Sequence, residues 1–154
     1  MPAPVTYKYP AEAYATRRKE SETHGEHNDC SVIAVSVACG ITYQEAHKAM
    51  AEQGRKNNDG SNPTSILKAI RMQGFHTESV EPCEIIDRYP GVHSGLRHIT
   101  THHPERFAKH WPSGTYVVFT RGHVAAIVDG VTVDWTHGRA RRVKMIYKIS
   151  AQNV

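Results

Sequence analysis

The sequence predicts an α+β fold in which helices come first along the chain and an antiparallel sheet comes second. Three observations predict this. Capped segments with helical spacing of apolar residues fill the first half, a β-branched and aromatic run opens the second half at 115–120, and Asp129-Gly130 joins two further apolar runs. Helices followed by strands in this order are typical of the α+β class.

The segment 30–40 predicts the central helix, because it is apolar on nearly every side. Its many β-branched residues would also suit a buried strand. Two signals favour a helix: Asn28 and Asp29 are good N-cap residues, and Gly40 suits a helix C-terminus. A helix of this kind is expected to lie in the centre of the domain.

Two further helices have recognisable starts. Thr42 and Glu45 have the spacing of a capping box, and Asn62 precedes Pro63 in the arrangement of a cap followed by a first-turn proline. A glycine follows each run and is expected to end it. The apolar face of the first of these helices is predicted to consist of Tyr43, Ala46, His47, Met50 and Ala51.

The second half of the chain predicts an antiparallel sheet. Strands are expected at 115–120, 124–128, 131–135 and 142–150, because these runs are rich in β-branched and aromatic residues. Asp-Gly between two such runs is a strong signal for a tight hairpin turn. We therefore expect Val128 to pair with Val131.

Length and composition predict one domain. The chain has 154 residues, of which 39% are hydrophobic and 22% charged, which suits a folded core. We divide it into an N-terminal extension at 1–24 with a short helix at 11–19, a helical part at 25–75, and the sheet at 114–150. A short helix is also predicted at 104–111.

The same composition bears on the cellular setting. No apolar run approaches the length of a membrane span, and the N-terminus shows no secretory signal pattern, so we expect a cytoplasmic protein without a membrane partner. The net charge of +4 is spread over the sequence, which does not favour a nucleic-acid partner. The sequence does not indicate an oligomeric state.

Three cysteines are an odd number at no repeating spacing, so we predict free thiols. Cys30 would fall in the first turn of the central helix. There the unpaired backbone N–H groups favour a thiolate and can hold the oxyanion of a tetrahedral intermediate. Cys39 lies at the opposite end of that helix and Cys83 in an irregular stretch, so neither shares this chemistry.

His123 and Asp134 are predicted to complete a triad with Cys30. With a two-residue turn at Asp129-Gly130, Ala125 lies opposite Asp134, and His123 and Asp134 become diagonal neighbours on one face. A carboxylate in that place orients the imidazole and stabilises its charged form. Asp129 already has a structural reason to be acidic, since it belongs to the turn.

The chain resembles papain-like cysteine peptidases, most closely the small C39-like proteins of bacterial and phage genomes. The likeness is carried by the nucleophile-helix motif at 28–35 with the capped helix at 42–45, and by the segments 107–116, 121–130 and 133–134. The resemblance implies a papain-like fold with a central nucleophile helix packed on the sheet. It also implies a catalytic order of Cys30, His123 and Asp134, and, for a phage protein, a place in the host cytoplasm or the virion.

The activity that the resemblance implies is that of a thiol protease. Such a hydrolase acts on a peptide or protein substrate through a thioacyl-enzyme intermediate, and it needs no cofactor. Papain-like enzymes usually place a glutamine six residues before the cysteine as an oxyanion donor. This sequence has His24 there, so His24, His27 and Asn28 are the candidates for that role.

Three other interpretations stay open at this point. The same triad could transfer an acyl group to an amine, or the fold could serve as a catalytically inactive binding module for protein or nucleic acid. A zinc site is the third, because His24, His27 and Cys30 are spaced three residues apart. The cap expected at 28–29 explains that region without a metal, so no metal ligands are assigned.

Overall fold

The computed structural model describes residues 19, 29–56, 59–86, 95–98, 107, 110–133 and 142–151. Within these ranges the protein is an α+β molecule, as predicted. Its described helices are α2 (Cys30–Cys39), α3 (Tyr43–Glu52) and α4 (Pro63–Met72). Each begins at the residue that its cap predicted.

The caps of α3 and α4 form the expected bonds. The Thr42 side chain accepts a bond from the Glu45 backbone N–H at 3.1 Å, and the Glu45 carboxylate accepts from the Thr42 N–H at 3.3 Å. The Asn62 side chain accepts from the Ser65 N–H at 2.8 Å, ahead of Pro63. One detail of α3 was wrong: Ala51 is exposed, and Ala49 takes its place on the buried face.

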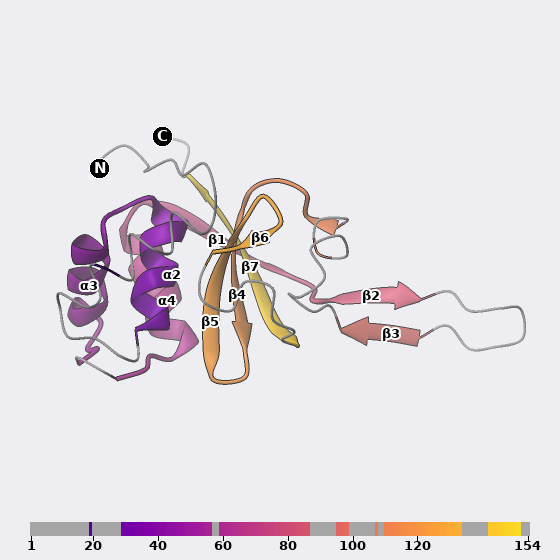
Figure 1. Cartoon of the computed structure of the whole chain (residues 1–154), viewed down its shortest axis with the longest axis horizontal. Helices are drawn as coiled ribbons and strands as arrows, with labels where there is room; N and C mark the ends of the chain where they lie inside the picture. The colour runs from indigo at the N-terminus through magenta and orange to yellow at the C-terminus, as the bar shows by residue number, and fades with distance from the viewer. Residues whose placement is uncertain are drawn as a thin grey trace, which may run out of the picture.

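The main sheet has five antiparallel strands in the order β1-β7-β4-β5-β6. Their bounds are β1 Phe75–Val80, β4 Thr115–Thr120, β5 His123–Val128, β6 Val131–Thr132 and β7 Val143–Ala151. Strands β2 (Cys83–Ile86) and β3 (Gly95–His98) form a separate two-stranded hairpin, which projects away from the rest of the molecule (Figure 1). Strands β4, β5 and β7 lie where the sequence predicted them. Of the strand predicted at 131–135, β6 covers only Val131–Thr132, Val133 is not in a strand, and 134–135 lie outside the described residues. Strands β1, β2 and β3 were not predicted.

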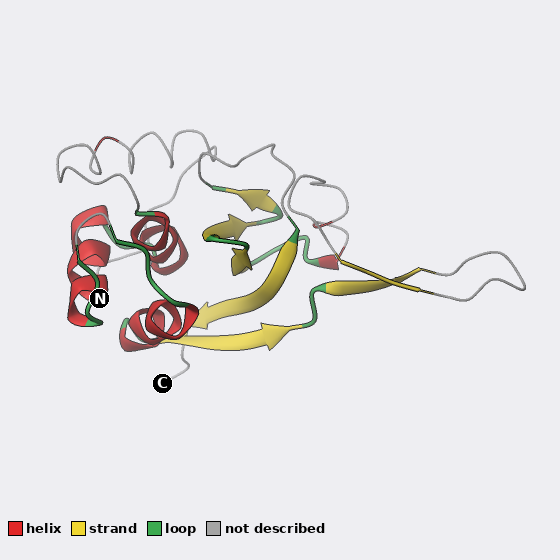
Figure 2. Ribbon diagram, turned by 90° about the horizontal axis from the view of Figure 1, so that it is seen from below, coloured by secondary structure: helices red, strands yellow, loops and turns green. Residues whose placement is uncertain are grey.

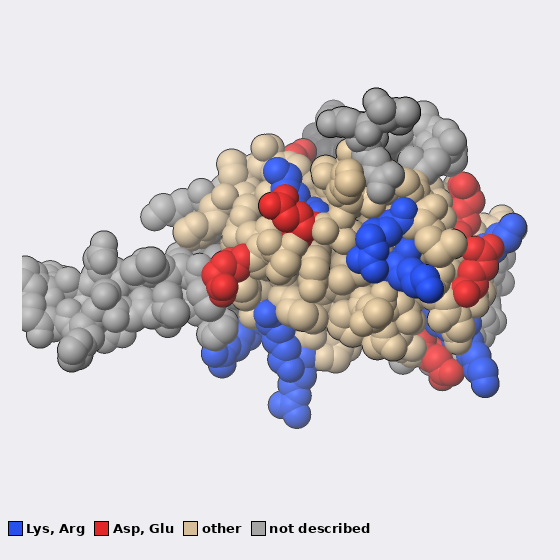
Figure 3. Space-filling view, turned by 180° about the vertical axis from the view of Figure 1, so that it is seen from behind, with Lys and Arg blue, Asp and Glu red and all other residues tan. Residues whose placement is uncertain are grey.

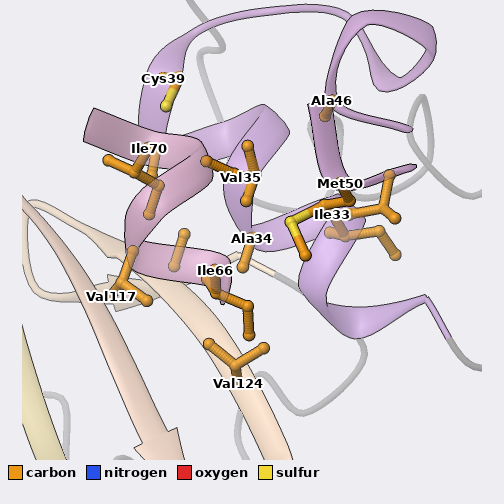
Figure 4. Close-up of a cluster of buried hydrophobic side chains, with 14 of the residues drawn as sticks. Ile33, Ala34, Val35, Cys39, Ala46, Met50, Ile66, Ile70, Val117 and Val124 are labelled. Atoms are coloured by element: carbon orange, nitrogen blue, oxygen red, sulfur yellow. The ribbon is translucent and has the colours of Figure 1, made fainter. Parts of the chain in front are cut away.

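The described helices all lie on one side of the main sheet (Figure 2): α2 and α4 pack against its strands, and α3 packs against α2 and α4. The core on this side joins apolar residues of α2, α3 and α4 to Val117 and Phe119 of β4, Val124 and Ala126 of β5 and Ile149 of β7. Figure 4 shows Val117 and Val124 reaching from the sheet toward Ala34 and Ile66 on the helices. We call this cluster the helix-side core.

A smaller cluster covers the opposite face of the sheet. Tyr116, Val118, Ile127, Val143 and Ile146 pack there against Phe107. The rings of Phe107 and Trp111 lie 4.9 Å apart, and the Trp111 N–H donates to the Phe107 carbonyl at 2.9 Å. That bond belongs to the short helix predicted at 104–111, of which the structure describes residues 107, 110 and 111. Of the helix predicted at 11–19, only Lys19 is described, and it is helical.

None of the described helices is long and apolar enough to cross a membrane.

Candidate active site at the first turn of α2

Cys30 is the first residue of α2, and its thiol is half-buried against the helix-side core. The first backbone bond of the helix runs from the Ile33 N–H to the Asp29 carbonyl at 3.0 Å. The N–H groups of residues 30–32 precede this bond, so none of them has a partner within the helix. A negative charge on the Cys30 sulfur would be favoured at this position.

Asp29 occupies the N-cap position, but its side chain makes no capping bond. Instead the Tyr43 hydroxyl donates to the Asp29 carboxylate at 2.7 Å, and both side chains are buried. The expected side-chain cap by Asp29 was therefore wrong. The physical reason is the packing of α2 against α3, which brings a strong donor to the carboxylate from outside the helix.

The second residue of α2, Ser31, was not singled out from the sequence. Its side chain is 1% exposed, and the hydroxyl oxygen has no hydrogen-bond partner among the residues described. A buried hydroxyl without a partner is uncommon in folded proteins, since each one carries a desolvation cost. The only sequence signal is a serine directly after the candidate nucleophile, in a run whose one other polar residue is Ser36.

The C-terminal end of α2 differs from the N-terminal end in the burial of its cysteine and in its capping. Cys39 is 3% exposed, and burial raises the pKa of its thiol to about 12. Gly40 adopts a left-handed conformation (φ 63°) and donates to the Val37 carbonyl, while the Ile41 N–H donates to the Ser36 carbonyl at 3.1 Å. This is the Schellman arrangement that the glycine predicted.

Both Cys30 and Cys39 are free of disulfides, and the side chain of Cys83 lies outside the described residues.

His123 is the first residue of β5 and is buried, with 9% of its surface exposed. It follows a two-residue turn, Arg121-Gly122, and pairs with Thr120 of β4. Side chains alternate along a strand, and Val124 and Ala126 belong to the helix-side core. His123 therefore lies on the other face, together with Ala125 and Ile127.

The helix of Cys30 and the strand of His123 are packed against each other. In Figure 4, Val124 lies on the side of α2 that carries Ala34, and Cys39 lies toward the far end of the helix. The first half of α2 is thus the part nearer to the start of β5. The structure thus places α2 next to β5. Cys30, however, packs on the helix side of the sheet, whereas the strand alternation places the His123 side chain on the opposite face.

The hairpin register agrees with the prediction over its described length. Val128 pairs with Val131, and the Val133 N–H donates to the Ala126 carbonyl at 2.9 Å. Asp134 is the next residue and lies outside the described residues. The same register, continued by one residue, would put Asp134 opposite Ala125 and on the face of His123, so its role stays a prediction.

Asp129 has the structural role that the sequence indicated. It adopts a left-handed conformation (φ 50°) in the hairpin turn, before Gly130 (φ 81°). Its carboxylate accepts a bond from the Gly114 N–H at 2.9 Å, and its own N–H donates to the Gly114 carbonyl at 2.9 Å. These bonds explain an acidic residue here without any catalytic function.

The three oxyanion candidates, His24, His27 and Asn28, lie outside the described residues. The zinc interpretation depends on His24 and His27, so it stays a prediction. Among the side chains that the structure does describe, no group of three or more histidine, cysteine, aspartate and glutamate residues could hold a metal ion.

The surface and the aromatic residues bear on the nucleic-acid interpretation. On the face shown in Figure 3, lysine and arginine side chains stand among aspartate and glutamate side chains. Trp111 packs against the smaller core cluster, and the Tyr147 ring meets Phe119 edge-on at 6.0 Å. These two aromatic residues have packing roles, while Trp135 lies outside the described residues.

Comparisons with known proteins give no match, whether with protein-family models, with curated protein sequences or with solved structures. The function is therefore inferred from the residues and their geometry.

Proposed function

We propose that this protein is a cysteine hydrolase with a papain-like fold, and that it acts as a thiol peptidase through Cys30. One observation carries the proposal. Cys30 offers a half-buried thiol at the start of a buried helix, and the side chain at the N-cap, Asp29, is bonded by Tyr43 and makes no capping bond to the first turn. This environment favours a thiolate and donors for an oxyanion in the same place.

The proposed reaction has two stages. The Cys30 sulfur attacks the carbonyl carbon of a peptide bond, and the carbonyl oxygen becomes an oxyanion near the first turn of α2. His123 takes the thiol proton and gives it to the leaving amine, which leaves a thioacyl-enzyme. Water then attacks the thioester with His123 as the base, and Cys30 is regenerated. Asp134 holds the imidazole in the required tautomer.

This reaction requires the His123 ring to come within about 3 to 4 Å of the Cys30 sulfur. The strand alternation places His123 on the face opposite the helix-side core, so the ring has to reach the sulfur around the start of β5. That observation favours a second candidate function: a papain-like fold that binds peptides without cleaving them. The two candidates differ in whether His123 affects the chemistry of Cys30.

A panel of peptide and ester substrates, assayed on purified variants, separates the two. For the hydrolase we expect Cys30→Ala to abolish turnover and His123→Ala to lower kcat by at least about 100-fold, since general base catalysis contributes that much. Circular dichroism of each variant shows whether it is folded. Turnover that survives Cys30→Ala contradicts the proposal, and binding without turnover in the wild type supports the second candidate.

The acidic residues of the hairpin provide a matched pair of variants. Asp134→Ala is expected to lower kcat, because it removes the acceptor for the imidazole N–H. Asp129→Asn is expected to leave kcat unchanged, because asparagine keeps the oxygen that accepts from Gly114 and suits the turn. The reverse result would mean that Asp129 is the orienting residue.

A further inference from the structure

The Ser31 hydroxyl is a buried polar group without a structural role among the described residues; the Ser61 hydroxyl, far from α2 in the sequence, is the other one. Ser31 is 1% exposed, and no partner for its hydroxyl is found in the described part of the chain. Ser36, on the same helix and equally buried, shows the contrast: its hydroxyl donates to the Ile41 carbonyl at 2.7 Å. Ser36 stabilises the end of α2, whereas Ser31 has a cost without a described benefit.

The position of Ser31 in the helix fixes where its hydroxyl lies. Side chains of an α-helix tilt toward its N-terminus, so a residue covers the turn before its own Cα. Ser31 is the second residue of α2, directly after Cys30. Its hydroxyl is therefore directed to the end of the helix where the Cys30 thiol and the first-turn N–H groups lie.

The side chain of the N-cap residue makes no capping bond at this end of the helix. A carboxylate at the N-cap position usually accepts from the first-turn N–H groups and would compete there with any other anion. In this protein the Asp29 carboxylate accepts from Tyr43 instead, at 2.7 Å, and makes no capping bond. The first turn thus combines backbone donors that the Asp29 side chain does not cap with a buried Ser31 hydroxyl that has no partner among the described residues.

We propose that the Ser31 hydroxyl is an oxyanion donor, which binds the carbonyl oxygen of the substrate during attack by Cys30. The inference rests on the proposed function, since it assigns a further residue to that same site. When the Cys30 sulfur forms its bond to the carbonyl carbon, the π electron pair moves onto oxygen, and this oxygen accepts a hydrogen bond from Ser31. The pair returns when the leaving group departs with the proton from His123, and Ser31 keeps its own proton throughout.

The experiment compares Ser31→Ala with Ser36→Ala, two equal truncations of buried serines on one helix. For Ser31→Ala we expect kcat/KM for a cleaved ester or peptide to fall about 100-fold, the usual effect of losing one oxyanion donor. We also expect Tm to rise by a few degrees, because a buried hydroxyl without a partner is removed. For Ser36→Ala we expect the reverse: an unchanged kcat/KM and a lower Tm, because a buried bond is lost.

Two further measurements identify the step that is affected. Alkylation of Cys30 by iodoacetamide forms no oxyanion, so Ser31→Ala should alkylate at the wild-type rate. A peptide aldehyde forms a hemithioacetal whose oxygen occupies the oxyanion site, so its affinity should weaken in Ser31→Ala and not in Ser36→Ala.

The outcomes separate this inference from the proposed function. A Ser31→Ala variant with wild-type kcat/KM, or one that is unfolded or has a lower Tm, overturns the role of Ser31 alone, provided that turnover still requires Cys30. A wild-type protein that cleaves no substrate and binds no aldehyde overturns both.

Discussion

Each end of α2 carries a cysteine and a serine, but the two ends differ in the burial of the cysteine and in the hydrogen bonding of the serine. At the C-terminal end, Cys39 is buried, Ser36 donates to a carbonyl and Gly40 closes the helix with backbone bonds. At the N-terminal end, Cys30 is half-buried and the Ser31 hydroxyl has no partner within the described residues. Cys39 and Ser36 thus have structural roles, and Cys30 and Ser31 are the pair that we propose for catalysis.

This difference shows how one helix can serve stability and function at separate places. A satisfied helix end contributes to the free energy of unfolding, whereas an end with open donors does so only when a ligand occupies it. Under the proposed function, bound substrate supplies a partner for the Ser31 hydroxyl at the start of α2. The comparison can be tested by changing each end separately.

The largest expected effect is on thiol reactivity. Burial raises the pKa of Cys39 to about 12, so only about one thiol in 10,000 is ionised at pH 8. We expect Cys30 to alkylate at least about 1000-fold faster than Cys39 at that pH, because an ordinary thiol with a pKa of about 8.5 is about one quarter ionised at pH 8. Mass spectrometry after limiting iodoacetamide measures the labelling of each cysteine, with Cys83 as a third reporter. Equal labelling would remove the distinction between the two ends.

The second effect is on stability at alkaline pH. The raised pKa of Cys39 means that its thiol stabilises the fold fully below pH 9.0, the ordinary value, and that this stability is lost as pH rises toward about 12. Each pH unit in that window corresponds to about 1.4 kcal/mol, so the loss approaches roughly 4 kcal/mol at its upper end. Urea unfolding at several pH values checks this.

Cys39→Ala is the control for the alkaline effect. It lowers the free energy of unfolding at neutral pH, because it leaves a small cavity, but it should flatten the decline between pH 9 and 12. A decline that is equally steep in this variant would show that other groups are responsible.

A smaller effect is expected from the helix end itself. Gly40 has φ 63°, a conformation that costs a residue with a Cβ about 1 kcal/mol. Gly40→Ala should therefore lower the free energy of unfolding by about that amount and leave the alkylation rate of Cys30 unchanged. Chemical denaturation and the alkylation assay measure the two quantities. A change in Cys30 reactivity would mean that the two ends of α2 are coupled.

The parts of the fold that the sequence predicted are those with local causes. Thr42, Asn62 and Pro63 act within one helical turn, and each marked the start of its helix. Asp129-Gly130 acts within one hairpin, and it gave the register of β5 with β6. The unpredicted strand β1 alternates half-buried and exposed residues over 75–78, but its central residues are polar, so it lacks the β-branched and aromatic run that marked the other strands; it lies at the edge of the sheet and pairs with β7 alone.

The site was predicted less completely, because its features depend on tertiary packing. Cys30 was identified from its place in a helix, and the structure gives it that place. The Asp29–Tyr43 bond joins residues 14 positions apart, on two helices whose packing no local pattern reveals. The face of His123 depends on which side of the sheet the helices cover, and hairpin register alone does not determine that.

The smallest effect, and the finest test of the open helix end, comes from Tyr43→Phe. Loss of the hydroxyl frees the Asp29 carboxylate, which is already at the N-cap position and can turn to the first-turn N–H groups. A negative charge there disfavours the Cys30 thiolate by about 0.3 to 1 kcal/mol, so alkylation at pH 7 should slow by about twofold to fivefold, and its pH midpoint should move upward. Stability should change little, because the new cap contributes about 1 kcal/mol and offsets most of the lost bond.

Tyr147→Phe is the control, since Tyr147 packs against the same helix-side core without contacting Asp29 through a described bond. If Tyr43→Phe and Tyr147→Phe share the wild-type alkylation profile, the Asp29–Tyr43 bond is structural only, and the first turn of α2 is kept open by something else.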